Sequence, residues 1–419
     1  MRTRLLLLAT VLAVSASAIM SGCSSSKDST STQSSAAASS TTSTTSTTST
    51  TVADRSNSEA VTTTAFTGGE GGYATFRIPA VVAAQDGTLL AFAEGRKSSA
   101  ADDGDVDLVL KKSSDGGTTW GALQVVSEDG VNFVGNPSPV VDEETGRVVV
   151  LATHKNGQDS ELEILTATGQ DTSRVWLLTS EDNGTSWASP QEITEQVKRP
   201  EWRWFTVGPG HAIQLSVGKN AGRLVAPANY SDPQTGAGNV ALLSEDGGST
   251  WRIGAEGNPD DANNPDECTS AEMPDGSIIF SSRNQNQAAP WHRLRTTSSD
   301  SGQSFAAPFA EQVGLVVPVV QGSLLWDGDP SDSNTTSAAG RLLFSAPSNQ
   351  NDRVDLSIRS STDAGVTWSA GTLISAGPAG YSDLIELPGG LVGVLHEAGV
   401  SNSFERIDMT VLGRQKLGT

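Results

Sequence analysis

One short pattern recurs five times in this 419-residue sequence, and it constrains the fold more than any other feature. Its form is Ser-x-Asp-x-Gly-x-Thr-Trp, with Ser for Thr or Phe for Trp in two of the copies. The copies are Ser113–Trp120, Ser180–Trp187, Ser244–Trp251, Ser298–Phe305 and Ser361–Trp368. Their aspartates lie 54 to 67 residues apart, which is room for one four-stranded sheet per copy. With no clear helical periodicity after residue 60, this repetition predicts an all-β architecture.

The repeated pattern is an Asp box, and we predict from it a six-bladed β-propeller with Asp-box turns. Five blades would carry a box, and the segment after Tyr381 would form the sixth, completed by a first strand near Val61–Phe66. A short carboxylate can bind the backbone N–H groups of its own turn, and glycine permits a left-handed residue there. The boxes are therefore expected to be structural. Calcium or ligand sites are disfavoured because each box has only one acid at a fixed place.

The N-terminal 60 residues differ in composition from the rest. Residues 1–22 hold two arginines and the apolar run LLLLATVLAVSASAIM, which predicts a signal peptide and not a spanning helix. The following Ser21-Gly22-Cys23 resembles a bacterial lipobox, which implies lipid on Cys23; an ordinary signal cut near Ala16–Ala18 is the alternative. Residues 23–60, rich in Ser and Thr, predict a disordered tether, which leaves 61–419 as the folded domain. We expect an exported protein, held at the outer face of the cytoplasmic membrane or secreted.

Composition excludes several classes of function. The net charge of −21 disfavours nucleic acid or an anionic membrane surface as the main partner, although a local arginine cluster could still bind an acidic ligand. Two cysteines, Cys23 and Cys268, cannot form a disulfide framework, and Cys268 is expected to be a buried free thiol. Four scattered histidines give no metal-ligand spacing. We expect a monomer without a cofactor.

Three arginines from separate predicted blades are candidates for one anion site. Arg77 lies in Phe76-Arg77-Ile78-Pro79, Arg283 ends the strand SIIFSSR, and Arg353 opens RVDLSIR. A guanidinium is planar and permanently charged, and it can hold a carboxylate through two hydrogen bonds. The alternative for each arginine is an ion pair between blades, and Arg359 could be confused with Arg353.

A tyrosine and a glutamate lie in short motifs of their own. Tyr381 opens YSDLIEL, and Glu267 lies in ECTSAE, 16 residues before Arg283. A free tyrosine hydroxyl, with a pKa near 10, is a poor nucleophile, but a neighbouring carboxylate can accept its proton during attack. The alternatives are a half-buried strand tyrosine and a solvated turn glutamate.

Taken together, FRIP at Phe76–Pro79, the Asp boxes, GYSDL and ECTSAE resemble the sialidase (exo-α-neuraminidase) family over roughly residues 61–415. The resemblance implies that Arg77, Arg283 and Arg353 hold the carboxylate of a sialic acid, and it favours Arg353 over Arg359. It implies Tyr381 as the nucleophile, assisted by Glu267. Asp102 would be the general acid/base, with the adjacent Asp103 as the alternative. A further alternative is that both are solvated loop charges.

The same resemblance assigns supporting roles. Arg96 would bind polar groups of the sugar. Glu397 would orient Arg77, with a simple charge at a strand end as the alternative. Trp202 or Trp204 could line an apolar pocket, with core packing as the alternative for either. Asp260, Asp261 and Asp266 could bind calcium, but a solvated turn is favoured.

The expected activity is hydrolysis of terminal α-linked sialic acids from glycans, glycoproteins or glycolipids, with retention through a tyrosine-bound intermediate. The arginines would supply the positive charge, so no metal is expected to be needed. Two alternatives remain at this point. A trans-sialidase-type transglycosylase would share every residue named above. A non-catalytic propeller that binds sialylated glycans would be expected to lack Tyr381, Glu267 or the acid.

Overall fold

The computed structural model describes residues 53–232, 236–257, 263–286, 291–328 and 340–418. The predicted signal peptide, Cys23, most of the predicted tether and the pair Asp260-Asp261 lie outside the described residues. Contacts divide the chain into Met1–Thr51 and Val52–Thr419, and the second unit is described below. Among the described residues, no helix has both the length and the apolar character needed to span a membrane.

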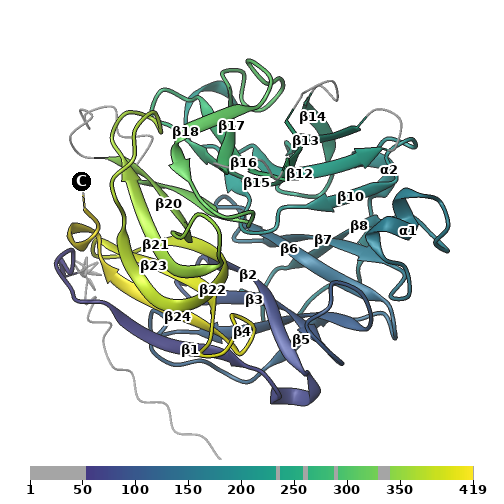
Figure 1. Ribbon diagram of the computed structural model, residues 1–419, viewed down its shortest axis with the longest axis horizontal. Helices are drawn as coiled ribbons and strands as arrows, with labels where there is room; N and C mark the ends of the chain where they lie inside the picture. Colours follow the sequence, from purple (N-terminus) through teal and green to yellow (C-terminus); the bar gives the residue numbers. More distant parts are fainter. Residues whose placement is uncertain (1–52, 233–235, 258–262, 287–290, 329–339, 419) are drawn as a thin grey trace, which may run out of the picture. The chain divides into compact units, whose positions relative to one another are not determined.

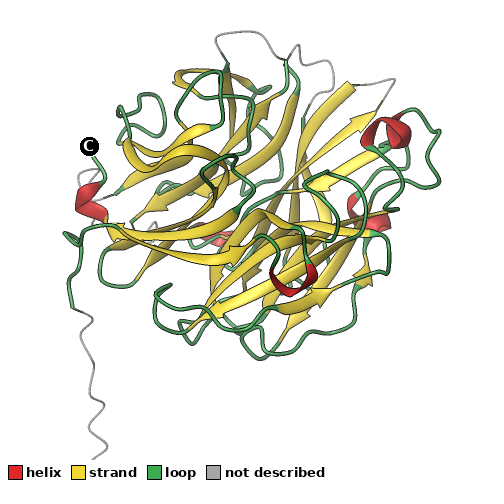
Figure 2. Cartoon of the chain, turned by 60° about the horizontal axis from the view of Figure 1, so that its bottom comes forward, coloured by secondary structure: helices red, strands yellow, loops and turns green. Residues whose placement is uncertain are grey.

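Nearly all the regular secondary structure of the described residues is β-strand, and the all-β prediction is confirmed (Figure 2). The helices are short. They are α1 (Glu161–Leu165), α2 (Thr194–Val197) and the 3₁₀ turns η1 (Glu70–Gly72), η2 (Gly218–Asn220) and η3 (Arg414–Lys416).

The described strands form four sheets (Figure 1). The first holds β2 (Thr75–Ala83), β3 (Leu89–Arg96), β4 (Val106–Ser113), β5 (Gln124–Ser127), β6 (Phe133–Val141), β7 (Val148–Lys155), β8 (Arg174–Ser180) and β9 (Gln191–Glu192). The second holds β10 (Trp204–Val207), β11 (Ile213–Gln214), β12 (Leu224–Asp232), β13 (Gly236–Ser244) and β14 (Arg252–Glu256). The third holds β15 (Pro265–Glu272), β16 (Ile278–Asn284), β17 (His292–Ser298) and β18 (Ala310–Val316). The fourth holds β1 (Val61–Thr67), β19 (Ser323–Asp327), β20 (Arg341–Pro347), β21 (Val354–Ser361), β22 (Thr372–Leu387), β23 (Leu391–Ala398) and β24 (Arg406–Gly413).

Neighbouring strands in these sheets mostly follow one another in the chain, so the sheets are antiparallel meanders. The two halves of the first sheet meet at a single parallel pair, Val106 with Phe133. In the fourth sheet the long strand β22 pairs with β21 through its first half and with β23 through its second. The predicted number of six blades is not decided by these pairings and remains a prediction.

The first strand pairs with the last, as the sequence predicted for Val61–Phe66. β1 runs antiparallel to β24, from Val61 opposite Val411 to Thr67 opposite Arg406 (Figure 1). The residues just before β1, placed in the tether by the sequence, bond to the same end of the chain. The amide of Gln415 donates to the carbonyl of Ser56 at 2.9 Å.

Each Asp box closes the turn that follows its strand. Ser113 is the last residue of β4, and its Oγ donates to Asp115 Oδ1 at 2.8 Å and accepts from the amide of Gly117 at 2.9 Å. Asp115 Oδ1 also accepts from the amide of Thr119 at 2.9 Å, and bonds to Thr119 lower the pKa of Asp115 to about 2. The other four boxes, after β8, β13, β17 and β21, repeat these three bonds. The carboxylates are thus used within their own turns.

Several strands carry a β-bulge or irregularity, and four of these set up the site described next. The register shifts follow Arg77 in β2, Gly135 in β6, Pro265 in β15 and Ala379 in β22. A bulge breaks the alternation of side chains and can turn two consecutive residues toward one face. The bulged Ile78 has φ 56°, which β-branched residues rarely adopt. Each bulge also frees backbone N–H groups that need new acceptors.

Candidate active site

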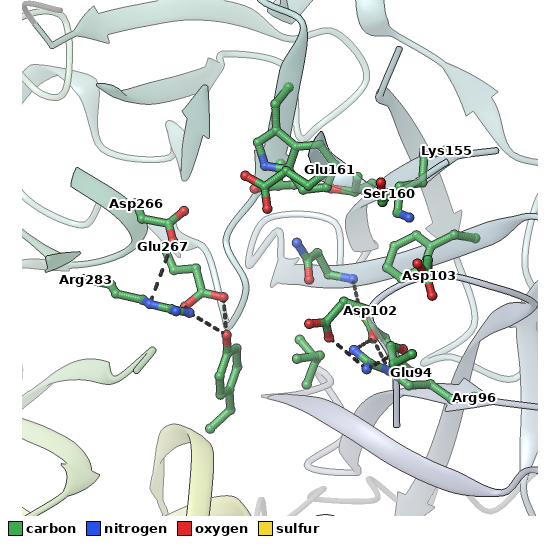
Figure 3. A pocket seen from close by; sticks show the side chains of 18 of the residues that line it. Glu94, Arg96, Asp102, Asp103, Lys155, Ser160, Glu161, Asp266, Glu267 and Arg283 are labelled. Atoms are coloured by element: carbon green, nitrogen blue, oxygen red, sulfur yellow. Dashed lines mark hydrogen bonds and ion pairs between the residues drawn. The ribbon is translucent and has the colours of Figure 1, made fainter. Parts of the chain in front are cut away.

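A cavity of about 410 Å³ opens where the four bulged strands meet (Figure 3). Asp102, Glu267, Tyr381, Arg96 and Arg283 line it, all of them predicted from sequence. In Figure 3, Asp266, Glu267 and Arg283 lie on one side of the cavity, and Glu94, Arg96 and Asp102 lie on another. The remaining predicted residues, Arg77, Arg353 and Glu397, are not among the lining residues, but each contacts Tyr381, which is.

Buried Glu397 joins the first arginine to the tyrosine strand. Arg77 Nε donates to Glu397 Oε1 at 3.0 Å, and the bulge amide of Ile78 donates to the same oxygen at 3.1 Å. The other oxygen of Glu397 accepts from the amide of Tyr381 at 3.0 Å. Gly380 is required here, since a Cβ would lie 2.0 Å from Glu397 Oε2. The Glu397 carboxylate thus accepts hydrogen bonds from the backbone at two bulges, and it holds Arg77 and Tyr381 in position relative to each other.

The phenol of Tyr381 points at a carboxylate and a guanidinium. Its hydroxyl donates to Glu267 Oε1 and accepts from Arg283 NH1 at 2.9 Å. Arg283 NH1 also donates to Glu267 Oε2 at 2.8 Å. Burial and then Glu267 raise the pKa of Tyr381 well above its usual value, although Arg283, Arg353 and Arg77 act against this. The tyrosine is therefore neutral near pH 7, and Glu267 is in contact to receive its proton.

The three predicted arginines converge on Tyr381. The guanidinium carbons of Arg77 and Arg353 lie 5.3 and 5.6 Å from the centre of its ring, and Arg283 contacts its hydroxyl. Arg353 also donates to the carbonyl of Val319 at 2.9 Å. The alternative, Arg359, instead donates to the carbonyl of Val316.

Asp102 lies on an exposed loop but is held by two buried arginines. Its Oδ1 accepts from Arg96 NH1 at 2.8 Å and from Arg77 NH1 at 3.1 Å, while the side chain is 83% exposed. Partial desolvation acts to raise the pKa of Asp102, but Arg96 and then Arg77 outweigh it and hold the pKa below its usual value. Asp102 is thus an anion beside Arg77 in this state. Asp103 also lines the cavity, on the side nearer Lys155 (Figure 3).

Arg96 binds protein groups more than it faces the cavity. It donates to Glu94 Oε2 through Nε at 2.9 Å and NH2 at 2.6 Å, and NH1 donates to the carbonyl of Ala101 at 2.7 Å. Glu94 in turn accepts from the bulge amide of Asn136 at 2.8 Å. Sequence reasoning missed Glu94, although residues two apart on a strand share a face and the pair Glu94–Arg96 was a readable signal.

Further ionisable residues line the cavity that the sequence did not single out. Asp266, predicted only as a weak calcium candidate, lies 3.8 Å from Arg283 through Oδ2. Burial and then the neighbouring Glu267 raise the pKa of Asp266 to about 6. Glu161, in the first turn of α1, and Lys155 also line the cavity. Burial lowers the pKa of Lys155, whose Nζ donates to the carbonyl of Asp159 at 2.8 Å.

The two candidate tryptophans lie in different environments. Trp204 lines the cavity, whereas Trp202 is buried in a core cluster and stacks on Tyr230 with ring centres 4.1 Å apart. Cys268 is a buried free thiol, as predicted, and burial raises its pKa to about 12. Among the described residues, no group of three or more His, Cys, Asp or Glu side chains could hold a metal ion.

A buried arginine supports the site from behind. Arg293 on β17 is 1% exposed and donates to the carbonyls of Val320 and Ser281, each at 2.9 Å. Burial lowers its pKa to about 10. The neighbouring Val319 carbonyl holds Arg353, and Gln321 exchanges hydrogen bonds with the backbone of Ser382, next to Tyr381. The segment 319–321 therefore links Arg293 to Arg353 and Tyr381.

The chain is similar to a known family, to proteins of other organisms and to a solved structure. Residues 87–394 match the family model of the BNR repeat-like domain. A sialidase of Micromonospora viridifaciens is 30% identical over 354 residues, which cover 82% of this chain but only 53% of that protein. Sialidase-3 of Rattus norvegicus is 30% identical over 416 residues, covering 86% of this chain and 96% of that protein. Among solved structures, the Hadza microbial sialidase Hz136 gives a TM-score of 0.74 at 26% identity, over 85% of this chain and 69% of that one.

Proposed function

Because this chain belongs to the sialidase family of BNR-repeat proteins, we propose that it is an exo-acting sialidase. It releases terminal α-linked sialic acids from glycans, glycoproteins or glycolipids and retains the configuration at the anomeric carbon. The observation that carries the proposal is the Tyr381 hydroxyl in contact with Glu267 and Arg283, with Arg77 and Arg353 close to the same ring.

Three guanidinium groups around one point favour an anion between them. Arg77, Arg283 and Arg353 would hold the carboxylate that a sialic acid bears on its anomeric carbon, and their planar forks suit two-point binding. This places the anomeric carbon next to the Tyr381 hydroxyl. Glu397 compensates the charge of Arg77, and Glu267 and Asp266 lie beside Arg283, so these two arginines are held in position by protein carboxylates.

A neutral phenol suits attack beside a carboxylate, because an anionic nucleophile would be repelled. As the Tyr381 oxygen bonds to the anomeric carbon, its proton passes to Glu267, and the bond to the leaving oxygen breaks. In the second displacement water attacks the same carbon from the side the leaving group vacated. The tyrosine oxygen then leaves and takes its proton back from Glu267.

Asp102 would give the leaving oxygen its proton and then accept one from the attacking water. For this it must first be protonated. A substrate carboxylate on Arg77 would compete with the Asp102 carboxylate for the same guanidinium and repel it, which raises the pKa of Asp102 toward the working range. We assign the role to Asp102 instead of Asp103 because it is Asp102 that contacts Arg77 and Arg96.

The test is hydrolysis of an aryl α-sialoside by the purified chain, with Tyr381→Phe as the paired variant. We expect the wild type to release the α-anomer of sialic acid first, as seen by proton NMR. A 3-fluorinated sialosyl fluoride should leave an adduct on Tyr381 in peptide mapping, and Tyr381→Phe should not be labelled. The β-anomer as first product, or an adduct on another residue, would refute the mechanism. Absence of sialoside cleavage would refute the activity.

Two structural expectations belong to the same proposal. We propose that the meanders complete a six-bladed propeller, supported by the four-strand spacing of the Asp boxes and by the pairing of β1 with β24. We also propose that Cys23 carries lipid and that the following tether holds a monomeric domain at the outer face of the membrane. Mass spectrometry of the mature N-terminus would test the second point, since a mature chain starting elsewhere would contradict it.

A further inference from the structure

A second hollow lies on the other side of the loop that carries Asp102. The residues Thr75, Ser99, Ala100, Asn402, Phe404 and Glu405 form an open groove of about 460 Å³, here called the Phe404 groove. Ser99 and Ala100 face this groove, whereas the next two residues, Ala101 and Asp102, face the active-site cavity. One short loop thus separates the two hollows, and it bears the proposed acid.

Both walls of the Phe404 groove are held by hydrogen bonds. On one wall, the carboxylate of Glu405 accepts from the amides of Val400 and Ser401 at 2.9 and 2.8 Å, which closes the turn between β23 and β24. On the other, the carbonyls of Ala100 and Ala101 accept from Arg96. The groove is therefore built before any ligand arrives.

The ring of Phe404 connects the groove to Arg77 and, through Arg77, to the proposed acid Asp102. It lies on the guanidinium of Arg77, with 4.3 Å between the guanidinium carbon and the ring centre, and Arg77 NH1 binds Asp102. Phe404 is half-buried and lines the groove. An apolar ring with a few polar neighbours, here Thr75 and Asn402, is a common lining for a sugar-sized ligand.

We propose that the Phe404 groove binds the leaving saccharide, the sugar attached to the sialic acid by the bond that is cut. This inference rests on the proposed function. Asp102 must reach the oxygen of that bond, so the group beyond the oxygen begins at the Asp102 loop. Groove and cavity share that loop, and a hexose beyond it meets Phe404. The groove thus selects for a sugar as leaving group, whereas the cavity selects for the sialic acid.

Two substrates with the same sialic acid but different leaving groups distinguish binding in the Phe404 groove from binding in the active-site cavity. 3′-Sialyllactose has a disaccharide leaving group, and methyl α-sialoside has a methoxyl group that needs protonation equally but cannot fill the groove. We expect Phe404→Ala to lower the ratio of kcat/KM for sialyllactose to that for the methyl sialoside by about three- to tenfold. Phe404→Tyr should restore the ratio, because it keeps the ring.

The matched control is Val400→Ala, an 81% exposed apolar residue on the same turn that does not line the groove. It should leave the ratio unchanged. Equal losses on both substrates in Phe404→Ala would mean that the ring only supports Arg77, and an unchanged ratio would mean that the groove is empty during the reaction. Either result overturns the inference while the proposed function stands. A wild-type chain that cleaves neither substrate would overturn both.

Discussion

Arg77 and Asp102 form an ion pair of 3.1 Å in which the arginine is buried and the aspartate is exposed. The proposed substrate carboxylate needs the same guanidinium that Asp102 contacts here. We therefore expect binding to separate the pair and to leave the carboxyl group of Asp102 beside a second anion.

The first prediction is that ligand binding takes up a proton. The pKa of Asp102 is held low by Arg96 and Arg77 in the free protein, and a bound carboxylate raises it. Affinity for a sialic acid analogue should therefore fall as pH rises. Calorimetric titration in two buffers of different ionisation enthalpy should show proton uptake in the wild type and little in Asp102→Asn. Equal uptake in both would contradict the pairing.

The second prediction ranks two arginines by how much each contributes to the free energy of unfolding. Arg77→Lys loses the fork onto fully buried Glu397 and should lower the free energy of unfolding by about 2 kcal/mol. Arg353→Lys loses one bond to a carbonyl and should cost about 1 kcal/mol or less. Both should lower kcat/KM. Urea denaturation of the two variants checks the ranking, and equal losses would show that Glu397 does not depend on Arg77.

The third prediction concerns Asp266, whose pKa of about 6 exceeds its unfolded value of 3.8. The folded state then holds the proton more tightly, so the wild type loses stability as pH rises from about 4 through 6. Asp266→Asn should remove this loss, and its advantage should grow over that range to on the order of 2 kcal/mol. Thermal unfolding at pH 4 and pH 7 checks it, and an advantage independent of pH would refute the titration.

Asp102, in the same cavity, is a control because its pKa is shifted in the opposite direction to that of Asp266. The folded pKa of Asp102 lies below its usual value, so its contribution to stability is present at neutral pH and is lost only in acid. Asp102→Asn should accordingly be the less stable partner at pH 7, by a small amount because the side chain is exposed.

The fourth prediction tests Arg293 as a positioning residue. Arg293→Met frees the Val320 carbonyl and loosens the segment that holds Arg353 and Tyr381. We expect KM to rise and kcat to fall, with kcat/KM down about tenfold. Arg295, two residues along β17, donates to the carbonyl of Ala364 in the Asp box after β21, and Arg295→Met should keep wild-type kinetics. Similar kinetics for both variants would show that Arg293 is only a core residue.

The sequence could predict those parts of the site that lie in short motifs. FRIP, ECTSAE and GYSDL led to Arg77, Glu267 and Tyr381, and the structure brings these residues together. The Asp boxes led to the all-β fold because each box completes its bonds within a single turn, which needs no distant partner.

The rest depends on bulges and on packing between strands far apart in the chain. In a regular strand Asp266 and Glu267 would face opposite sides, and only the bulge in β15 lets both line the cavity. Arg293 becomes relevant through the segment 319–321, which also contacts Arg353 and strand β22. Neither a bulge nor such a contact leaves a local pattern in the sequence.

The pairing of β1 with β24 has a consequence for synthesis. β1 is the first described strand to leave the ribosome, and its partner, 348 residues away at Thr62 and Thr410, is the last. Until β24 emerges, β1 lacks its partner, and β24 then supplies the only strand that it pairs with among those described. A chain stopped before Arg406 should therefore expose β1 to proteases, however well the intervening sheets have formed. We expect the emergence of β24, and not the number of residues made before it, to decide when β1 becomes resistant to degradation.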